Sequence, residues 1–224
     1  MSSESGIVLE QLGAPSRRMV MRGGLQVAGA LTAAILVPGV FGATAAAAAP
    51  LTSPRMVRPE LLAQAIDALA RHGDAIPLHD RLAIADFAAP SAEPRFHLVD
   101  LASGDTTTLR VAHGSGSDPL HTGWLQQFSN DEGSNASSEG AFLTDEYYDG
   151  KHGLSQRLIG LDPTNCNALD RAIVIHSAWY ANPDMLETYG QLGRSQGCFA
   201  VGEADLALVF ERLGPGRMVF SAKV

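Results

Sequence analysis

A mainly β fold with two or three short helices is the fold class that this sequence predicts. Three observations support it. The run RAIVIH at residues 171–176 is a continuous apolar stretch, which is typical of a strand buried on both faces. Two strand-like runs, 95–101 and 106–112, flank a turn that contains Gly104, as in a hairpin. Helical spacing of apolar residues marks the segment 59–71.

The first 49 residues have the pattern of an export signal. Arg17 and Arg18 form a twin-arginine pair, and residues 23–41 are moderately apolar and uncharged. Small residues at 43–49 follow, in the arrangement at which signal peptides are cleaved. An uncleaved membrane anchor is the alternative, but the glycines and the proline in the apolar stretch lower its hydrophobicity and helix propensity. We predict export through the Tat route to the periplasm, with no stable membrane anchor after cleavage.

The remaining chain is predicted to be a helical lead-in at residues 50–80 and one domain at 81–224. Pro59 suits the start of the helix at 59–71, and Gly73 suits its end. The segment 113–140 is rich in Gly, Ser, Asn and Asp, so we expect a long loop that is either functional or disordered. Further apolar patterns predict strands at 82–87, 142–148, 154–161 and 217–222, and a helix at 203–213.

Charge and composition exclude several kinds of partner. The whole chain has a formal net charge of -8, and residues 1–49, with three arginines and two glutamates, carry +1, which leaves -9 for the rest. A protein with this balance has no basic face for nucleic acid or anionic lipid. The spacings of the cysteines and histidines match no metal site, so we expect no metal and no cofactor. We expect a monomer.

Cys198, in the stretch GQLGRSQGCFAV at 190–201, admits four interpretations. It could pair with Cys166 in an exported protein, ligate a metal, fill the core, or act as a nucleophile. A domain of this size does not need a lone disulfide, and we expect Cys166 to be a free thiol. The neighbours favour the nucleophile: Gly197 permits close approach of the backbone to a substrate, and the cation of Arg194 lowers a nearby thiol pKa. His176, at the end of the strand predicted at 171–176, supplies a base.

These residues resemble a known family. IVIHSAWY at 173–180 followed by GRSQGCFAV at 193–201 is similar to the YkuD-type L,D-transpeptidases, in which a histidine precedes an S-x-G-C motif. The closer match is the murein L,D-transpeptidase catalytic domain branch, which the stretches 85–101, 111–117, 128–142 and 148–162 also resemble. The chain departs from the family at two positions. Gln196 replaces the histidine of the commoner S-H-G-C form, and Phe199 stands where this branch has proline.

The resemblance implies a YkuD-like β-sandwich, with residues 81–224 as the catalytic domain, and peptidoglycan stem peptides as substrate. It makes Cys198 the nucleophile and His176 the base. The backbone amides of Gly197 and Cys198 become the donors to the oxyanion, and Ser195 is expected to orient His176 through its carbonyl or hydroxyl. The acceptor is an amine in a transpeptidase and water in an L,D-carboxypeptidase. The departures at Gln196 and Phe199 keep a non-catalytic peptidoglycan-binding domain as a third possibility, and Phe199 is expected to reshape the acyl pocket.

Five further residues are candidates for substrate binding. Arg194 either pairs with a stem-peptide carboxylate or is a solvated surface charge. His113 is expected to line the cleft, and Ser138, with Ser134 and Ser137, to form a polar wall. Trp179 and Tyr180 either shield the thiolate from water or simply pack. His152 is interpreted equally as a cleft residue or as a turn histidine.

Overall fold

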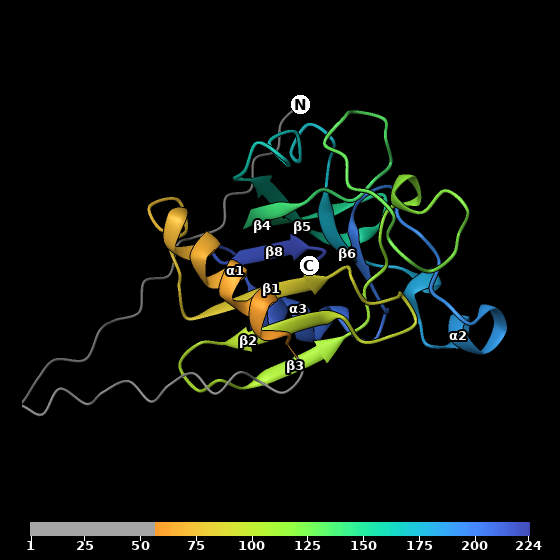
Figure 1. Ribbon diagram of the computed structural model, residues 1–224, viewed down its shortest axis with the longest axis horizontal. Helices are drawn as coiled ribbons and strands as arrows, with labels where there is room; N and C mark the ends of the chain where they lie inside the picture. Colours follow the sequence, from red (N-terminus) through yellow and green to blue (C-terminus); the bar gives the residue numbers. More distant parts are fainter. Residues whose placement is uncertain (1–56) are drawn as a thin grey trace, which may run out of the picture. The chain divides into compact units, whose positions relative to one another are not determined.

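The computed structural model describes residues 57–224, and the signal peptide predicted at residues 1–49 lies outside them (Figure 1). Among the described residues, no helix is long and apolar enough to cross a membrane. The elements follow in the order α1 (Pro59–Arg71), β1 (Arg81–Asp86), β2 (Phe96–Asp100), β3 (Thr106–Leu109), η1 (Ser115–Ser117), β4 (Gly140–Gly150), β5 (Gly153–Gly160), β6 (Val174–Ser177), η2 (Trp179–Ala181), α2 (Asp184–Tyr189), β7 (Phe199–Val201), α3 (Leu206–Leu213) and β8 (Met218–Ala222).

The strands form one sheet of eight in the order β3-β2-β1-β8-β4-β5-β6-β7. The pairs β1–β8 and β6–β7 are parallel, and the other neighbours are antiparallel. The prediction of a mainly β fold with a few short helices is therefore confirmed.

The two ends of this sheet lie against each other. The ring of Phe199 in β7 stacks on that of Phe96 in β2 with centroids 6.2 Å apart, and Ala112 after β3 forms a bridge with Ala200 of β7. Six strand spacings separate β2 from β7, which is about 29 Å in a flat sheet. The sheet is thus folded over on itself, and a register shift between Thr144 and Tyr147 of β4 marks one place where it bends.

Two apolar clusters occupy the two faces of the sheet. Alternate residues of β1 belong to different clusters, Ala83 and Ala85 to one and Leu82 and Ile84 to the other. The helix α3 contributes Val209 and Leu213 to the first cluster, which also holds the phenylalanine rings of the folded-over sheet. The helix α1 covers the opposite face, where Figure 1 shows it lying across β1 and β8.

Most predicted elements are present with adjusted ends. The helix predicted at 59–71 matches α1, and the hairpin predicted at 95–112 is β2 and β3. The strand predicted at 171–176 begins later, as β6 at Val174, and the helix predicted at 203–213 begins at Leu206. Two elements are absent from the sequence-based prediction, α2 and β7. The helix α2 is only six residues long and fully buries none of them, and β7 is only three residues long, so both are too short to show a periodic pattern.

Candidate functional site

A cavity of about 430 Å³ lies where β6, the turn between β4 and β5, and the segment before β7 meet. Both Cys198 and His176 line it. Its full lining is Tyr148, Lys151, His152, Arg171, Ala172, His176, Tyr180, Arg194, Ser195, Gln196 and Cys198.

The register of β6 and β7 brings the cysteine and the histidine to the same face of the sheet. Ile175 pairs with Phe199 and His176 with Ala200. Alternate residues point to opposite faces, so Ile175 and Phe199 enter the core while His176 and Cys198 share the other face. His176 lies in β6, and Cys198 directly precedes β7, so the two residues lie diagonally across the paired ends of these strands.

His176 is held as a neutral imidazole. Its Nδ1 lies 2.8 Å from the carbonyl oxygen of Ser177, and a carbonyl only accepts, so Nδ1 donates and Nε2 keeps its lone pair. The ring is buried and stacks on that of His152, with centroids 4.2 Å apart and planes 17° apart. Burial lowers the pKa of His176 to about 4, despite the hydrogen bond to Ser177, and His152 and Lys151 lower it further by charge. His176 is therefore neutral at pH 7.

Cys198 is held as a neutral thiol in this structure. Its side chain is buried, and its Sγ lies 3.6 Å from the carbonyl oxygen of Ala172. Over the described residues 57–224, no hydrogen bond joins Sγ to the ring of His176. Burial raises the pKa of the Cys198 thiol, and the backbone N–H of Val174 and the charges of Lys151 and Arg171 only oppose that rise.

The rate of Cys198 alkylation is therefore expected to keep rising with pH. Because the thiol pKa lies above its ordinary value of 9.0, the thiolate fraction increases about tenfold per pH unit at neutral pH. A Cys166→Ser variant removes the exposed thiol, and iodoacetamide incorporation is then followed by intact mass between pH 5 and 10. A preformed thiolate–imidazolium pair would instead give a plateau at neutral pH, and that result would contradict the neutral ground state.

Ser195 and Gly197 shape the backbone next to the sulfur. The hydroxyl of Ser195 donates to the carbonyl oxygen of Cys198 at 2.7 Å and accepts the N–H of Gly197 at 3.1 Å. The N–H of Gly197 already donates to Ser195. Of the two N–H groups predicted to stabilise the oxyanion, only that of Cys198 is therefore available to the substrate. Ser195 does not orient His176, because the ring is held by Ser177 instead.

The glycine at 197 is required by the local geometry. Its φ of +108° lies in a region that L side chains rarely adopt, and an added Cβ would come within 2.6 Å of the Ala136 carbonyl oxygen. This position therefore favours glycine on both conformational and steric grounds.

Two basic residues of the cavity, Lys151 and Arg171, were not predicted as site residues, and His152, one of whose two interpretations was a cleft residue, also lines it. Lys151 and His152 lie at the turn between β4 and β5. The interpretation of His152 as a cleft residue was the only indication from the sequence that this turn contributes to the site. Arg171 is the first residue of the RAIVIH run, where it was treated as the start of a strand.

Arg171 is fixed by the long loop. Its guanidinium donates to the carbonyl oxygens of Ser129 and Ala136 and to the hydroxyls of Ser134 and Ser138. Ser138 was predicted to form part of the cavity wall, but it does not line the cavity. Its hydroxyl instead holds Arg171, which does. The loop at 113–140 is ordered in this region by these hydrogen bonds.

His113 also lies elsewhere than expected. It is buried outside the cavity, where its Nδ1 accepts from Arg95 at 2.8 Å and its Nε2 donates to Asp118 at 3.3 Å. Its backbone carbonyl accepts the N–H of Ser195 at 2.9 Å. His113 thus supports the segment before Cys198 rather than contacting the cavity.

The remaining candidates divide between two places. Arg194 lines the cavity, and its Nη1 donates to the carbonyl oxygens of Asp118 and Pro119, so it is anchored rather than freely solvated. Tyr180 lines the cavity, whereas the exposed Trp179 lines an adjoining groove and does not shield the sulfur.

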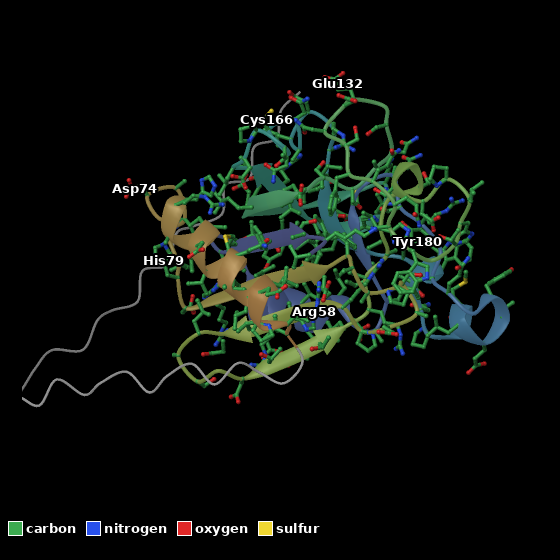
Figure 2. All side chains as sticks on the ribbon, in the orientation of Figure 1. Arg58, Asp74, His79, Glu132, Cys166 and Tyr180 are labelled. Carbon is green, nitrogen blue, oxygen red and sulfur yellow. The ribbon has the colours of Figure 1, made fainter. Side chains whose placement is uncertain are left out.

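Phe199 and Cys166 lie outside the cavity. Phe199 does not reshape the acyl pocket, because its ring packs in the core against those of Phe87, Phe96 and Phe142. Cys166 is a free, exposed thiol, and Figure 2 shows it well apart from Tyr180.

The site thus combines a mainly β domain with a thiol and an imidazole that line one cavity. A family model described as "L,D-transpeptidase catalytic domain" matches residues 54–221. That match covers most of the chain, and the chain therefore belongs to this family. A comparison with curated proteins gives no match.

Solved structures of two L,D-transpeptidases and of a cell shape determining protein are similar at low identity. An L,D-transpeptidase from Mycobacterium smegmatis is 12% identical with a TM-score of 0.38, over 64% of this chain and 58% of that one. L,D-transpeptidase 3 from Mycobacterium tuberculosis, in complex with a faropenem-derived adduct, is 10% identical with a TM-score of 0.41, over 64% and 60%. The helical cell shape determining protein Pgp2 from Campylobacter jejuni is 13% identical with a TM-score of 0.42, over 75% and 57%. This chain spans less than two thirds of the length of each.

Proposed function

We propose that this chain is a peptidoglycan L,D-transpeptidase in which Cys198 forms a thioester with a stem tetrapeptide and releases D-alanine. One observation carries the proposal: Cys198, directly before β7, and His176, in the neighbouring strand β6, line one cavity. The position of Phe199 also supports it, because this departure from the family pattern lies in the core and does not line the cavity.

The first half of the reaction forms the thioester. Nε2 of His176 takes the proton of the Cys198 thiol as the sulfur attacks the carbonyl carbon before the terminal D-alanine. The negative charge on the carbonyl oxygen is stabilised by the N–H of Cys198. When the tetrahedral intermediate collapses, the C–N bond breaks and the imidazolium gives its proton to the leaving amine of D-alanine.

The second half transfers the acyl group. The amine of a second stem peptide attacks the thioester carbonyl and gives a proton to His176. The C–S bond breaks, and the imidazolium returns its proton to the sulfur. Because Sγ hydrogen-bonds to the Ala172 carbonyl in this structure, its hydrogen must turn toward Nε2 when substrate binds; catalytic hydrogen bonds often tighten only in the substrate complex.

The charge of the cavity suits a substrate with carboxylates. Lys151, Arg171 and Arg194 line it, although the chain as a whole is acidic. Stem tetrapeptides carry a terminal D-alanine carboxylate, which pairs with a guanidinium bidentately. Arg194 keeps its place as the candidate for this role, since only its Nη1 is used by Asp118 and Pro119 within the described chain.

One observation favours the non-catalytic alternative. The Cys198 side chain is only 8% exposed, and burial favours an unreactive thiol. In a peptidoglycan-binding domain the same cavity would hold stem peptides without acylation.

Product analysis tests the proposal. The mature chain is incubated with disaccharide tetrapeptides, and the products are separated and weighed by mass spectrometry. We expect dimers cross-linked between two third residues, together with free D-alanine. Tripeptides without dimers would identify an L,D-carboxypeptidase with water as acceptor. Substrate that binds but is not cleaved would identify the binding domain and contradict the proposal.

We also propose that the chain acts in the periplasm as a monomer. Residues 1–49 are then the signal peptide, 50–80 the lead-in that includes α1, and 81–224 the catalytic domain. This arrangement fits a family that acts on the cell wall. It is supported by the twin arginines at 17 and 18.

A further inference from the structure

A second groove of about 370 Å³ adjoins the Cys198 cavity. Tyr180 and Arg194 line both, so these two residues form the boundary that the two hollows share. Figure 2 shows Tyr180 beside the segment that leads to α2. The other lining residues come from η1, η2, α2 and the loops: Ser115, His121, Trp179, Met185, Tyr189 and Gly193.

Aromatic side chains dominate this groove and are left open to solvent. Trp179 is 66% exposed and Tyr189 is 64% exposed. The rings of Trp179 and Tyr180 meet edge to face, with centroids 5.9 Å apart and an interplanar angle of 79°. Several exposed aromatic rings around one hollow are typical of a surface that binds a ligand.

The backbone is built to keep Tyr180 in place. A Cβ at Gly193 would come within 2.6 Å of the Tyr180 Cβ, so the chain passes closer to this ring than other residues allow. The N–H of Gly193 donates to the Tyr180 carbonyl at 2.7 Å. The wall between the groove and the Cys198 cavity is therefore fixed.

We propose that this aromatic groove binds a sugar ring of the glycan strand that carries the reacting stem peptide. The inference rests on the proposed function, which places a stem peptide in the adjoining cavity. A sugar ring has an apolar C–H face that packs on an indole or phenol ring, and a rim of hydroxyls and amides that hydrogen-bonds to polar groups. His121 and Ser115 supply such groups beside the rings.

The reach of the substrate agrees with this placement. Three residues of the stem and the lactyl group link the sugar to the carbonyl that Cys198 attacks, and together they span about 15 Å when extended. This reach allows the sugar to lie in the groove that shares Tyr180 and Arg194 with the cavity. The carboxylates of the stem match the basic cavity, where Lys151 and Arg171 lie, whereas the sugar is neutral and matches the aromatic groove.

Fluorescence tests binding without any chemistry. The chain has two tryptophans, Trp124 and Trp179, and Trp124 lies outside the groove. In a Trp124→Phe, Cys198→Ala protein, Trp179 is the only indole. Titration with peptide-free glycan strands and with an N-acetylglucosamine oligomer is expected to give a saturable shift in its emission. The matched Trp179→Phe, Cys198→Ala protein is expected to give none.

Kinetics links the groove to the substrate. The ratio of kcat/KM for a glycan-linked tetrapeptide to that for the free tetrapeptide is measured in wild type. Trp179→Ala is expected to lower this ratio about tenfold, in line with the loss of one stacking contact. Trp124→Ala, which removes an exposed tryptophan elsewhere, is the control and is expected to leave the ratio unchanged.

The outcomes separate the two proposals. Saturable glycan binding by a chain that turns over no substrate would support the groove and overturn the proposed function. Turnover with a ratio unaffected by both Trp179→Ala and Tyr189→Ala would overturn the groove. A free tetrapeptide that shifts the Trp179 emission as strongly as the glycan would also overturn it, because the stem peptide would then be the occupant. A folded protein, checked by circular dichroism, that binds no glycan overturns it directly.

Discussion

Replacing Cys198 with alanine is expected to abolish the covalent adduct with a carbapenem and to lower the rate of tetrapeptide cleavage by at least about 10³-fold. Without the sulfur no thioester forms, and the remaining cavity only binds substrate. His176→Ala is expected to slow adduct formation by about 10²–10⁴-fold rather than abolish it, because the thiol then loses its proton without a base. Intact mass spectrometry and product analysis measure both effects.

The chain provides a matched control for this experiment. Cys166→Ser removes the other thiol, which is exposed and outside the cavity, and is expected to leave the adduct and the cleavage rate unchanged. An adduct that persists in Cys198→Ala and disappears in Cys166→Ser would contradict the assignment of the nucleophile.

Replacing Arg95 with methionine is expected to lower the free energy of unfolding by about 3–5 kcal/mol. This guanidinium is fully buried, and it donates to the carbonyl oxygens of Ala89 and Val111 and to Nδ1 of His113. Burial lowers its pKa to about 9, but it remains a cation at pH 7. The variant buries three acceptors without their donor. Urea denaturation at pH 7 measures the change.

Two further variants make this prediction specific. Arg110→Met removes a partly buried arginine that donates to one carbonyl oxygen, that of Ala92, and is expected to cost only about 1 kcal/mol. Arg95→Lys keeps the positive charge but loses the several N–H donors of the planar guanidinium. Its free energy of unfolding is expected to lie between those of wild type and Arg95→Met. If Arg95→Met unfolds at the same urea concentration as Arg110→Met, the network around Arg95 has no special role.

Local patterns account for what the sequence predicted well. The helix α1 is recognisable because its buried residues recur at helical spacing and proline starts it. The hairpin of β2 and β3 is recognisable because it pairs two apolar runs across a short turn, and β4 and β5 are recognisable as separate strands by their apolar runs. Cys198 and His176 stand out because each lies beside a short apolar run and in a family motif.

Contacts between distant segments account for what was missed. Arg171 enters the site because its guanidinium is bound by serines more than thirty positions away in the chain. His113 looked like a cleft residue because it begins a polar loop, but Arg95, on the far side of a hairpin, takes it into the interior. Hydrogen bonds between residues so far apart in the chain leave no pattern in the local sequence, so neither the place of Arg171 nor that of His113 could be predicted from it.

The short strand β7 ties the chemistry of the chain to correct pairing. Consecutive side chains at its start point to opposite sides: Cys198, directly before the strand, lines the cavity, and Phe199, its first residue, lies in the core. A slip of one residue against β6 would exchange the two, placing the phenyl ring in the cavity and the sulfur in the interior. A chain with this wrong strand register would therefore have no accessible thiol at the cavity, and reactivity at Cys198 depends on correct pairing of β6 and β7.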